Sequence, residues 1–166
     1  MSSPLFRAKR PSTPLAGPYG HPLHPMLVTV PIGAWVTSLV FDLASLVTGD
    51  AGFLAKGALW LIAIGVIGAL AAAAFGFLDF LAIEPGTAAY RTALAHMGLT
   101  LTVTAVFGAA WAWRLPGDAV GAGQLALSAA GLAGLAAAGT LGGRLAYRYG
   151  VRVADEVTQA EGFRQS

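Results

Sequence analysis

One stretch decides the fold of this chain: residues 57–83 read GALWLIAIGVIGALAAAAFGFLDFLAI, with Asp79 as the one charged side chain. An α-helix rises about 1.5 Å per residue, so about 20 apolar residues cross the hydrocarbon core of a bilayer. A helix that faces water on one side would carry a polar face, and this run is apolar all round. Residues 57–83 therefore predict a helix that spans a membrane.

Three further runs have the same character, at residues 25–47, 92–113 and 122–143. Glycine, proline and charged residues, which end helices, interrupt the chain at residues 48–52, 84–86 and 114–118. Connectors this short force neighbouring helices to run antiparallel. The sequence thus predicts an all-α membrane protein, a four-helix transmembrane bundle with up-down-up-down order. We expect the transmembrane domain to fill residues 25–143, between a flexible cytoplasmic tail at 1–24 and a cytoplasmic tail at 144–166.

The composition supports a membrane protein and excludes several kinds of site. Hydrophobic residues make up 56% of the chain and charged ones 11%, whereas a soluble domain has about 25% charged residues. The absence of cysteine excludes disulfides, thiolate metal sites and Cys-ligated iron–sulfur clusters. A net charge of +2 gives no argument for nucleic acid. Because no phosphate loop, nucleophile motif or metalloprotease spacing is present, we expect no catalytic constellation and no enzyme activity of the chain alone.

Lysine and arginine near the ends of the runs predict the orientation, because cytoplasmic loops carry an excess of both. With the N-terminus in the cytoplasm, only Lys56 and Arg114 lie on the outer side. The other eight lie on the inner side: Arg7, Lys9, Arg10, Arg91, Arg144, Arg148, Arg152 and Arg164. We therefore expect a multi-pass protein of a bacterial plasma (inner) membrane, with both termini cytoplasmic.

Small residues recur every four positions in two of the runs. Membrane helices associate through close packing of such residues, because lipid is as apolar as leucine. The fourth run carries Ala126, Ala130, Gly134, Ala138 and Gly142, and the second carries Gly65, Gly68, Ala69, Ala72 and Gly76. We interpret both as packing faces, which serve contacts within the bundle or self-association of the protein.

The first run has a polar stripe. His24, Pro31, Trp35, Ser38 and Asp42 follow at intervals of seven, four, three and four residues, which puts them on one helix face. Polar groups are costly in lipid, so we expect this face to point into the bundle, with a kink at the proline. The aspartate lies roughly 27 Å along the helix from the histidine, near the opposite membrane face. We interpret it as an interfacial carboxylate or a local hydrogen-bond acceptor.

The histidines indicate a site at one end of the bundle. His21 and His24 precede the first run and His96 begins the third, and odd-numbered helices enter from the same side. Asp79 lies at the same depth at the end of the second run, and we expect Arg144 to be its charge partner. These groups predict a cofactor or metal site. Alternatively, His21 and His24, each followed by a proline, only mark the entry into the first helix, and His96 forms a hydrogen bond with a neighbouring helix.

Two kinds of ligand agree with these residues. His24 and His96, on helices that lie diagonally in a square bundle, are candidate ligands of a haem iron or another metal. A closed zinc site needs four ligands, and His21 and Asp79 together with the same two histidines would supply that number. The residues alone do not decide between these sites.

Several motifs carry a family resemblance. They are HPLHPMLV at 21–28, PIG at 31–33, FD at 41–42, GFLDF at 76–80, His96 and GGRLAYRYGV at 142–151. With them the chain resembles a family of small predicted bacterial membrane proteins, the domain of unknown function 2231, from about residue 21 to residue 153. The resemblance implies a four-span membrane domain. Some relatives look to be joined to a Rieske-type iron–sulfur domain, which implies electron transfer through a b-type haem.

Three hypotheses of function follow. In the first, the bundle binds haem b between His24 and His96, Asp79 and Arg144 tune it or bind its propionates, and a separate redox protein exchanges electrons with it. In the second, the chain is a cofactor-free structural or assembly module of a membrane complex, packed through its Gly/Ala faces. In the third, protons or ions pass through the bundle between Asp42 and Asp79.

Overall fold

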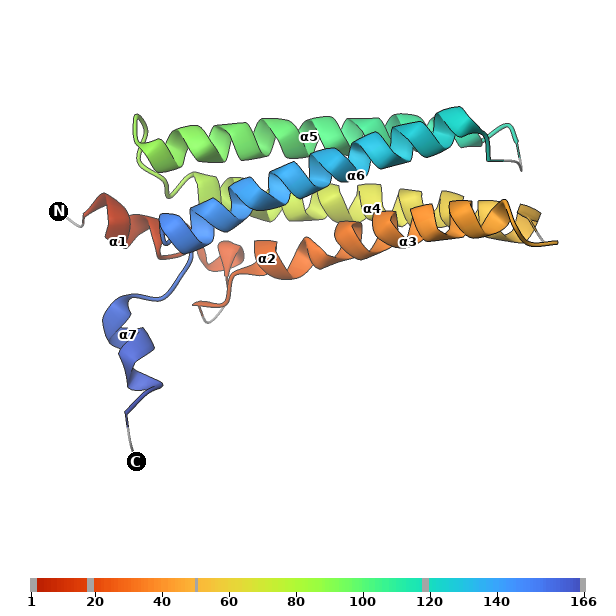
Figure 1. Ribbon diagram of the computed structural model, residues 1–166. Coiled ribbons are helices and arrows are strands. Elements are labelled where there is room, and N and C mark those ends of the chain that lie inside the picture. The colour runs from red at the N-terminus through yellow and green to blue at the C-terminus, as the bar shows by residue number, and fades with distance from the viewer. Residues whose placement is uncertain (1–2, 18–19, 50, 118–119, 165–166) are drawn as a thin grey trace.

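The computed structural model describes residues 3–17, 20–49, 51–117 and 120–164. Asp50 and Asp118, which lie in two of the predicted connectors, and the outermost residues of both expected tails fall outside these ranges. Over the described residues the chain is helical and contains no strand. Its long helices are α3 (Thr29–Ser45), preceded by the short α2 (Leu23–Leu27), then α4 (Ala51–Phe80), α5 (Ala88–Arg114) and α6 (Ala122–Gly143), which lie alongside one another (Figure 1). The all-α prediction of four packed helices is confirmed.

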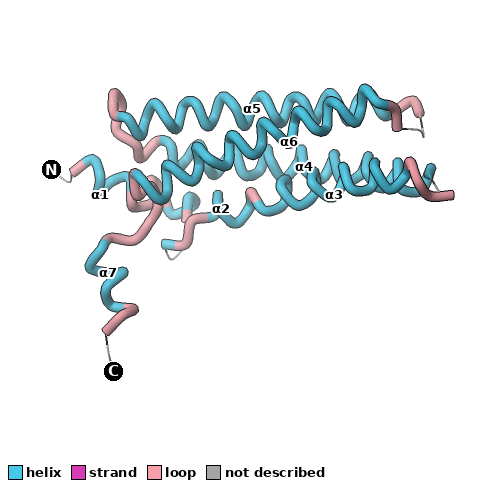
Figure 2. Tube along the Cα trace, viewed as in Figure 1, coloured by secondary structure: helices cyan, strands magenta, loops and turns pink. Residues whose placement is uncertain are grey.

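Among the residues that the structure describes, four segments are long and apolar enough to cross a bilayer: Leu23–Ser45, Ala51–Phe80, Ala88–Arg114 and Ala122–Arg148. The last of these continues α6 through η3 (Arg144–Arg148), a π-helical turn. Shorter elements in the described part of the chain are α1 (Pro4–Ala8), the 3₁₀ turn η1 (Pro14–Ala16) and α7 (Glu156–Glu161). Figure 2 shows loops gathered at the two ends of the bundle and α7 projecting away from it.

The first span is broken at Val28, where α2 ends and α3 begins. The cause is Pro31, which has no amide hydrogen and whose ring clashes with the carbonyl group of residue 27, four positions earlier. The interruption expected at this proline is therefore present, displaced by one turn toward the N-terminus. It separates the short helix that carries His24 from the rest of the span.

The polar stripe of the first span faces the interior, as predicted. The buried residues of α3 are Pro31, Ala34, Trp35, Ser38, Asp42 and Ser45. At the centre of the bundle the Trp35 ring stacks on Phe107 of α5, with ring centroids 4.1 Å apart and planes 8° from parallel. The indole Nε1 donates a hydrogen bond of 3.3 Å to the Ile62 carbonyl oxygen of α4. This core joins three of the four long helices.

The glycines of the two ladders make room for large side chains of neighbouring helices. Gly65 lies directly against the Trp35 indole, and a Cβ added at Gly134 would be 2.8 Å from Val103 Cγ2. Gly131, one turn before Gly134, abuts the Phe107 ring in the same way. Contacts this close confirm the packing role within the bundle, and self-association stays a prediction.

Both segments that we expected as tails contact one end of the bundle. Ala8 and Ala16 are buried, the Ser12 hydroxyl donates a 2.6 Å hydrogen bond to the Leu78 carbonyl oxygen, and Arg7 forms an ion pair with Glu84. The limits of the transmembrane domain and the side of the membrane on which the termini lie stay predictions.

Candidate functional site

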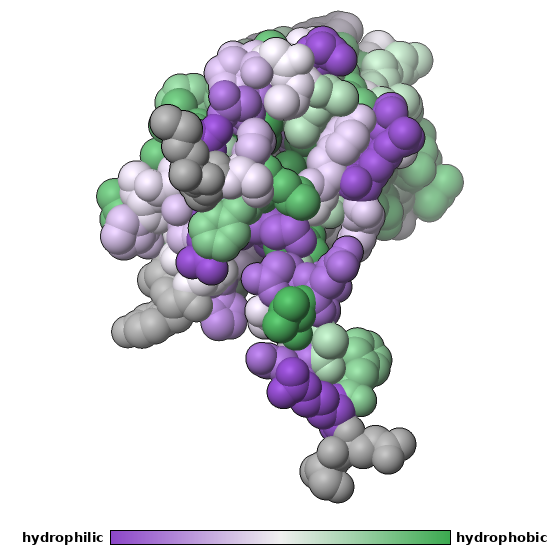
Figure 3. Space-filling model, turned by 90° about the vertical axis from the view of Figure 1, so that its left-hand side faces the viewer, coloured by the Kyte–Doolittle hydropathy of each residue, from purple (hydrophilic) through white to green (hydrophobic). Residues whose placement is uncertain are grey.

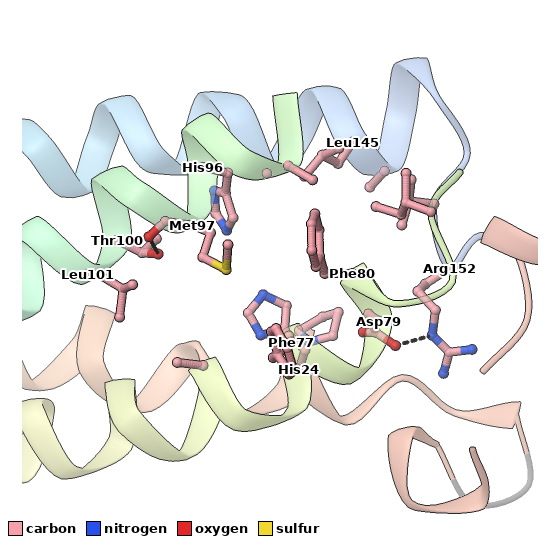
Figure 4. Close-up of a pocket in the computed structure, with 18 residues that line it drawn as sticks. His24, Phe77, Asp79, Phe80, His96, Met97, Thr100, Leu101, Leu145 and Arg152 are labelled. Carbon is pink, nitrogen blue, oxygen red and sulfur yellow. Dashed lines mark hydrogen bonds and ion pairs between the residues drawn. The ribbon is translucent and has the colours of Figure 1, made fainter. Parts of the chain in front are cut away.

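A cavity of about 300 Å³ opens at this same end of the bundle. Its ionisable lining residues are His24 of α2, Asp79 of α4, His96 of α5 and Arg152, which follows η3. Most of the wall is apolar and includes Phe77, Phe80, Ile83, Met97, Leu101 and Leu145. Figure 4 shows the two imidazoles pointing toward one another across this space, with the ion pair between Asp79 and Arg152 beside them.

His24 is held by the second span. Its Nδ1 lies 2.8 Å from the Ala72 carbonyl oxygen. Since a carbonyl oxygen only accepts hydrogen bonds, the nitrogen carries the proton and donates it. Gly76, one turn further along α4, makes the approach feasible, because a Cβ there would lie 2.8 Å from the same nitrogen. In the neutral ring the lone pair is then on Nε2.

His96 repeats the arrangement on the other pair of helices. Its Nδ1 lies 2.9 Å from the Ala138 carbonyl oxygen of α6, so this nitrogen also donates. A Cβ added at Gly142 would be 3.3 Å from the imidazole Cε1. Ala72, Gly76, Ala138 and Gly142 all belong to the predicted ladders, so each small-residue face contains a seat for one histidine.

The two imidazole rings face each other at close range. Their centroids are 6.3 Å apart and their planes are 88° from parallel. Each ring also bonds a neighbouring helix, which is the structural role that we considered for a lone membrane histidine. The hydrogen bond to the neighbouring helix uses only Nδ1, so Nε2 of both histidines is available to bind a ligand.

The structure does not assemble the four-ligand zinc set. His21 is exposed and does not line the cavity. Among the described residues, no three His, Cys, Asp or Glu side chains are grouped closely enough to hold a metal ion. Because a closed zinc site takes four ligands, what remains is a site of two imidazoles.

The expected pairing of Asp79 with Arg144 is replaced by another. Arg152 Nε lies 2.9 Å from Asp79 Oδ1, and both side chains are almost fully buried. Arg144 begins η3 and is exposed. The chain turns back after η3 through Gly150, whose φ is +68°, and this turn carries Arg152 under the end of α4. Because glycine favours turns, Gly150 is the residue from which this turn could have been predicted.

A second polar cluster, at the other end of the bundle, was not predicted. Arg114 donates hydrogen bonds of 2.6 and 2.8 Å to the two carboxylate oxygens of Asp42 and one of 3.0 Å to the Ser128 hydroxyl. The interpretation of this aspartate as an interfacial carboxylate or a local acceptor is therefore wrong: it is fully buried and ion-paired. Depth was the available signal, since Asp42 and Arg114 both lie toward the outer side in the predicted topology.

A family model described as a predicted membrane protein, DUF2231, matches residues 20–155 of this chain. Neither the search of curated proteins nor the search of solved structures produced a match.

Proposed function

Since this chain belongs to the DUF2231 family of predicted membrane proteins, we propose from its own geometry that it binds a b-type haem between His24 and His96. As such it would be a small electron-transfer subunit of the membrane.

The observation that carries the proposal is the hydrogen bond from each Nδ1 to a backbone carbonyl oxygen. Histidines that ligate a metal almost always donate their other ring N–H in this way, which fixes the tautomer and orientation of the ring and raises its basicity. Here two imidazole rings, each held by a different pair of helices, donate Nδ1 in the same way and lie opposite each other. A purely structural role requires no such matched pair.

The spacing of the rings agrees with two imidazoles that would hold one metal ion between them. Bonds of about 2 Å from the metal to each nitrogen, plus a ring radius of about 1.1 Å on each side, put the two centroids about 6 Å apart. The observed separation is 6.3 Å. The imidazoles of His24 and His96 would be enough to hold a haem iron, whereas a closed zinc site would need four ligands. The apolar wall around Phe77, Phe80 and Leu101 suits a macrocycle.

The bound group would supply one-electron transfer, and the protein would supply ligands, a dry surround and charge. Asp79 and Arg152 neutralise each other beside His24, so this pair adds little net charge to the site. Arg144 stays a candidate for contact with a propionate from the exposed end of the bundle. Without cysteine the chain holds no Cys-ligated iron–sulfur cluster, so its electron partner would be a separate protein.

An absorption spectrum tests the proposal. The protein purified from haem-replete cells is expected to show a Soret band, which His24→Ala and His96→Ala abolish and the exposed control His21→Ala leaves intact. His96→Met keeps a ligand of another kind, and a shifted spectrum with a raised midpoint potential is expected.

A preparation without a Soret band would end the haem proposal, as would an unchanged spectrum in His96→Ala. Altered folding or oligomeric state in both alanine variants, with no cofactor in the parent protein, would instead favour the cofactor-free assembly module.

A further inference from the structure

Arg152 joins three parts of the chain at one point. Its backbone N–H donates to the Ala8 carbonyl oxygen at 3.0 Å, its Nη2 donates to the Ala16 carbonyl oxygen at 3.2 Å, and its Nε lies 2.9 Å from Asp79 Oδ1. The N-terminal segment, the segment after η3 and the end of α4 therefore meet on a single side chain, which is only 5% exposed.

The surrounding chain is built around this residue. Arg152 has a φ of +59°, in the left-handed region that residues other than glycine seldom adopt. Such a conformation persists only where the neighbouring structure determines it. Gly17 lies so close to the guanidinium group that a Cβ there would collide with Arg152 Nη2 and the His21 carbonyl oxygen. Lys9 adds a second tie between the same two segments through a 3.1 Å hydrogen bond to the Ala154 carbonyl oxygen.

The ion pair also forms part of the wall of the histidine cavity, which Asp79 and Arg152 both line. Figure 3 looks onto this end of the bundle and shows hydrophilic residues gathered near the point where the C-terminal segment leaves it. In Figure 4 the ion pair lies between the two imidazoles and the N-terminal segment. The charge pair thus lies on the side of the cavity that faces the N-terminal segment.

We propose that Arg152 and Asp79 form a latch that fastens the two terminal segments over the end of the bundle and controls access to the histidine cavity. When the pair separates, the guanidinium group leaves Asp79, both segments lose their shared anchor, and the cavity, which already opens at this end of the bundle, opens wider toward the membrane surface. The latch rests on the proposed function in one respect: the ligand that it would admit and shield is the one that His24 and His96 bind. Its physical operation does not depend on which ligand binds.

The absence of cysteine allows a labelling test without background. Ala93 lines the cavity and is 6% exposed, so an Ala93→Cys variant reports on access to it. In detergent, its reaction with a sulfonated maleimide is expected to be about tenfold faster or more once Arg152→Gln or Asp79→Asn is added, because labelling follows the local opening. The double replacement is expected to be no faster than the quicker single one, since both changes break the same pair.

Two controls separate the latch from general loosening. Arg148→Gln removes the same charge from an exposed arginine at the end of η3, four residues before Arg152, and is expected to leave the rate unchanged. An Ala110→Cys variant puts the thiol at a fully buried position of α5 far along the helix from Ala93, and its rate is expected to stay low in all latch variants.

Equal acceleration at both thiol positions, or none at Ala93→Cys, would overturn the latch. Both outcomes are measured as thiol labelling rates and not as a Soret band, so a failure of the latch can be distinguished from a failure of the haem proposal.

Discussion

Asp42 and Arg114 are joined by two hydrogen bonds inside the bundle although 72 positions separate them in the chain. Their side chains are 0% and 5% exposed. Ser128 of α6 accepts a third bond from the same guanidinium group, so the pair connects the ends of α3, α5 and α6. At the opposite end of the bundle, His24 joins α2 to α4, His96 joins α5 to α6, and the ion pair of Asp79 with Arg152 joins α4 to the segment after η3.

Removal of one partner of this buried pair is expected to be costly. Asp42→Ala leaves the Arg114 charge buried without a counterion, and the free energy of unfolding is expected to fall by about 3–5 kcal/mol. Thermal or denaturant unfolding in detergent measures the change. The double variant Asp42→Ala, Arg114→Met removes both charges and is expected to recover much of the loss. Additive losses in the double variant would show that the two residues are not coupled.

Gly76 is expected to be intolerant of a side chain. In Gly76→Ala the new methyl group would lie 2.8 Å from His24 Nδ1, so the imidazole must move and its hydrogen bond to Ala72 weakens. The matched control is Gly98→Ala on α5, where a Cβ meets nothing within 4 Å. The control is expected to be neutral or to gain up to about 1 kcal/mol from helix propensity. A melting temperature that falls in Gly76→Ala and not in Gly98→Ala would support the role of Gly76 as the seat of His24. Equal melting temperatures of the two variants would contradict it.

The orientation predicted from lysine and arginine can be measured with single thiols. In intact cells, an impermeant maleimide is expected to label a Gly117→Cys variant, in the connector after α5, and not a Glu161→Cys variant in α7. Permeabilisation is expected to expose the second. The reverse pattern would put both termini outside and would also move the histidine cavity to the outer surface.

Acidification is expected to loosen α7. Asp155 caps this helix by accepting a 2.9 Å hydrogen bond from the Thr158 backbone N–H, and that bond lowers the pKa of the carboxyl group. Because the folded pKa lies below the unfolded one, the stabilisation is complete above about pH 4 and is lost as the pH falls through the folded value. Amide NMR signals of residues 156–161 report the change. In Asp155→Asn this titration is expected to disappear, and persistence of the pH response there would assign it to another group.

Much of the bundle was accessible from local patterns. The apolar runs predict the spans because a membrane helix has to satisfy its backbone within itself and cover about 30 Å of hydrocarbon. The buried stripe with Trp35, Ser38 and Asp42 follows from the period of the helix alone. The meeting of His24 with His96 follows from short connectors, which bring the starts of two alternate helices to one end.

The partners of the charged groups were not accessible in the same way. Asp79 had several arginines within reach of the membrane surface, and the sequence offers no periodicity that ranks Arg144 against Arg152. The choice depends on the turn after η3, where a positive φ at Gly150 and at Arg152 reverses the chain.

By itself the sequence determined that the chain has four apolar spans and that the polar stripe of the first one faces inward, because burial in lipid acts on each segment separately. Only the tertiary structure decided that Arg114 pairs with Asp42, that Arg152 pairs with Asp79, and that both histidines donate Nδ1 to backbone carbonyl groups. The reason is geometric: ion pairs and hydrogen bonds need contacts within about 3 Å, and such distances between remote residues are set only when whole helices pack.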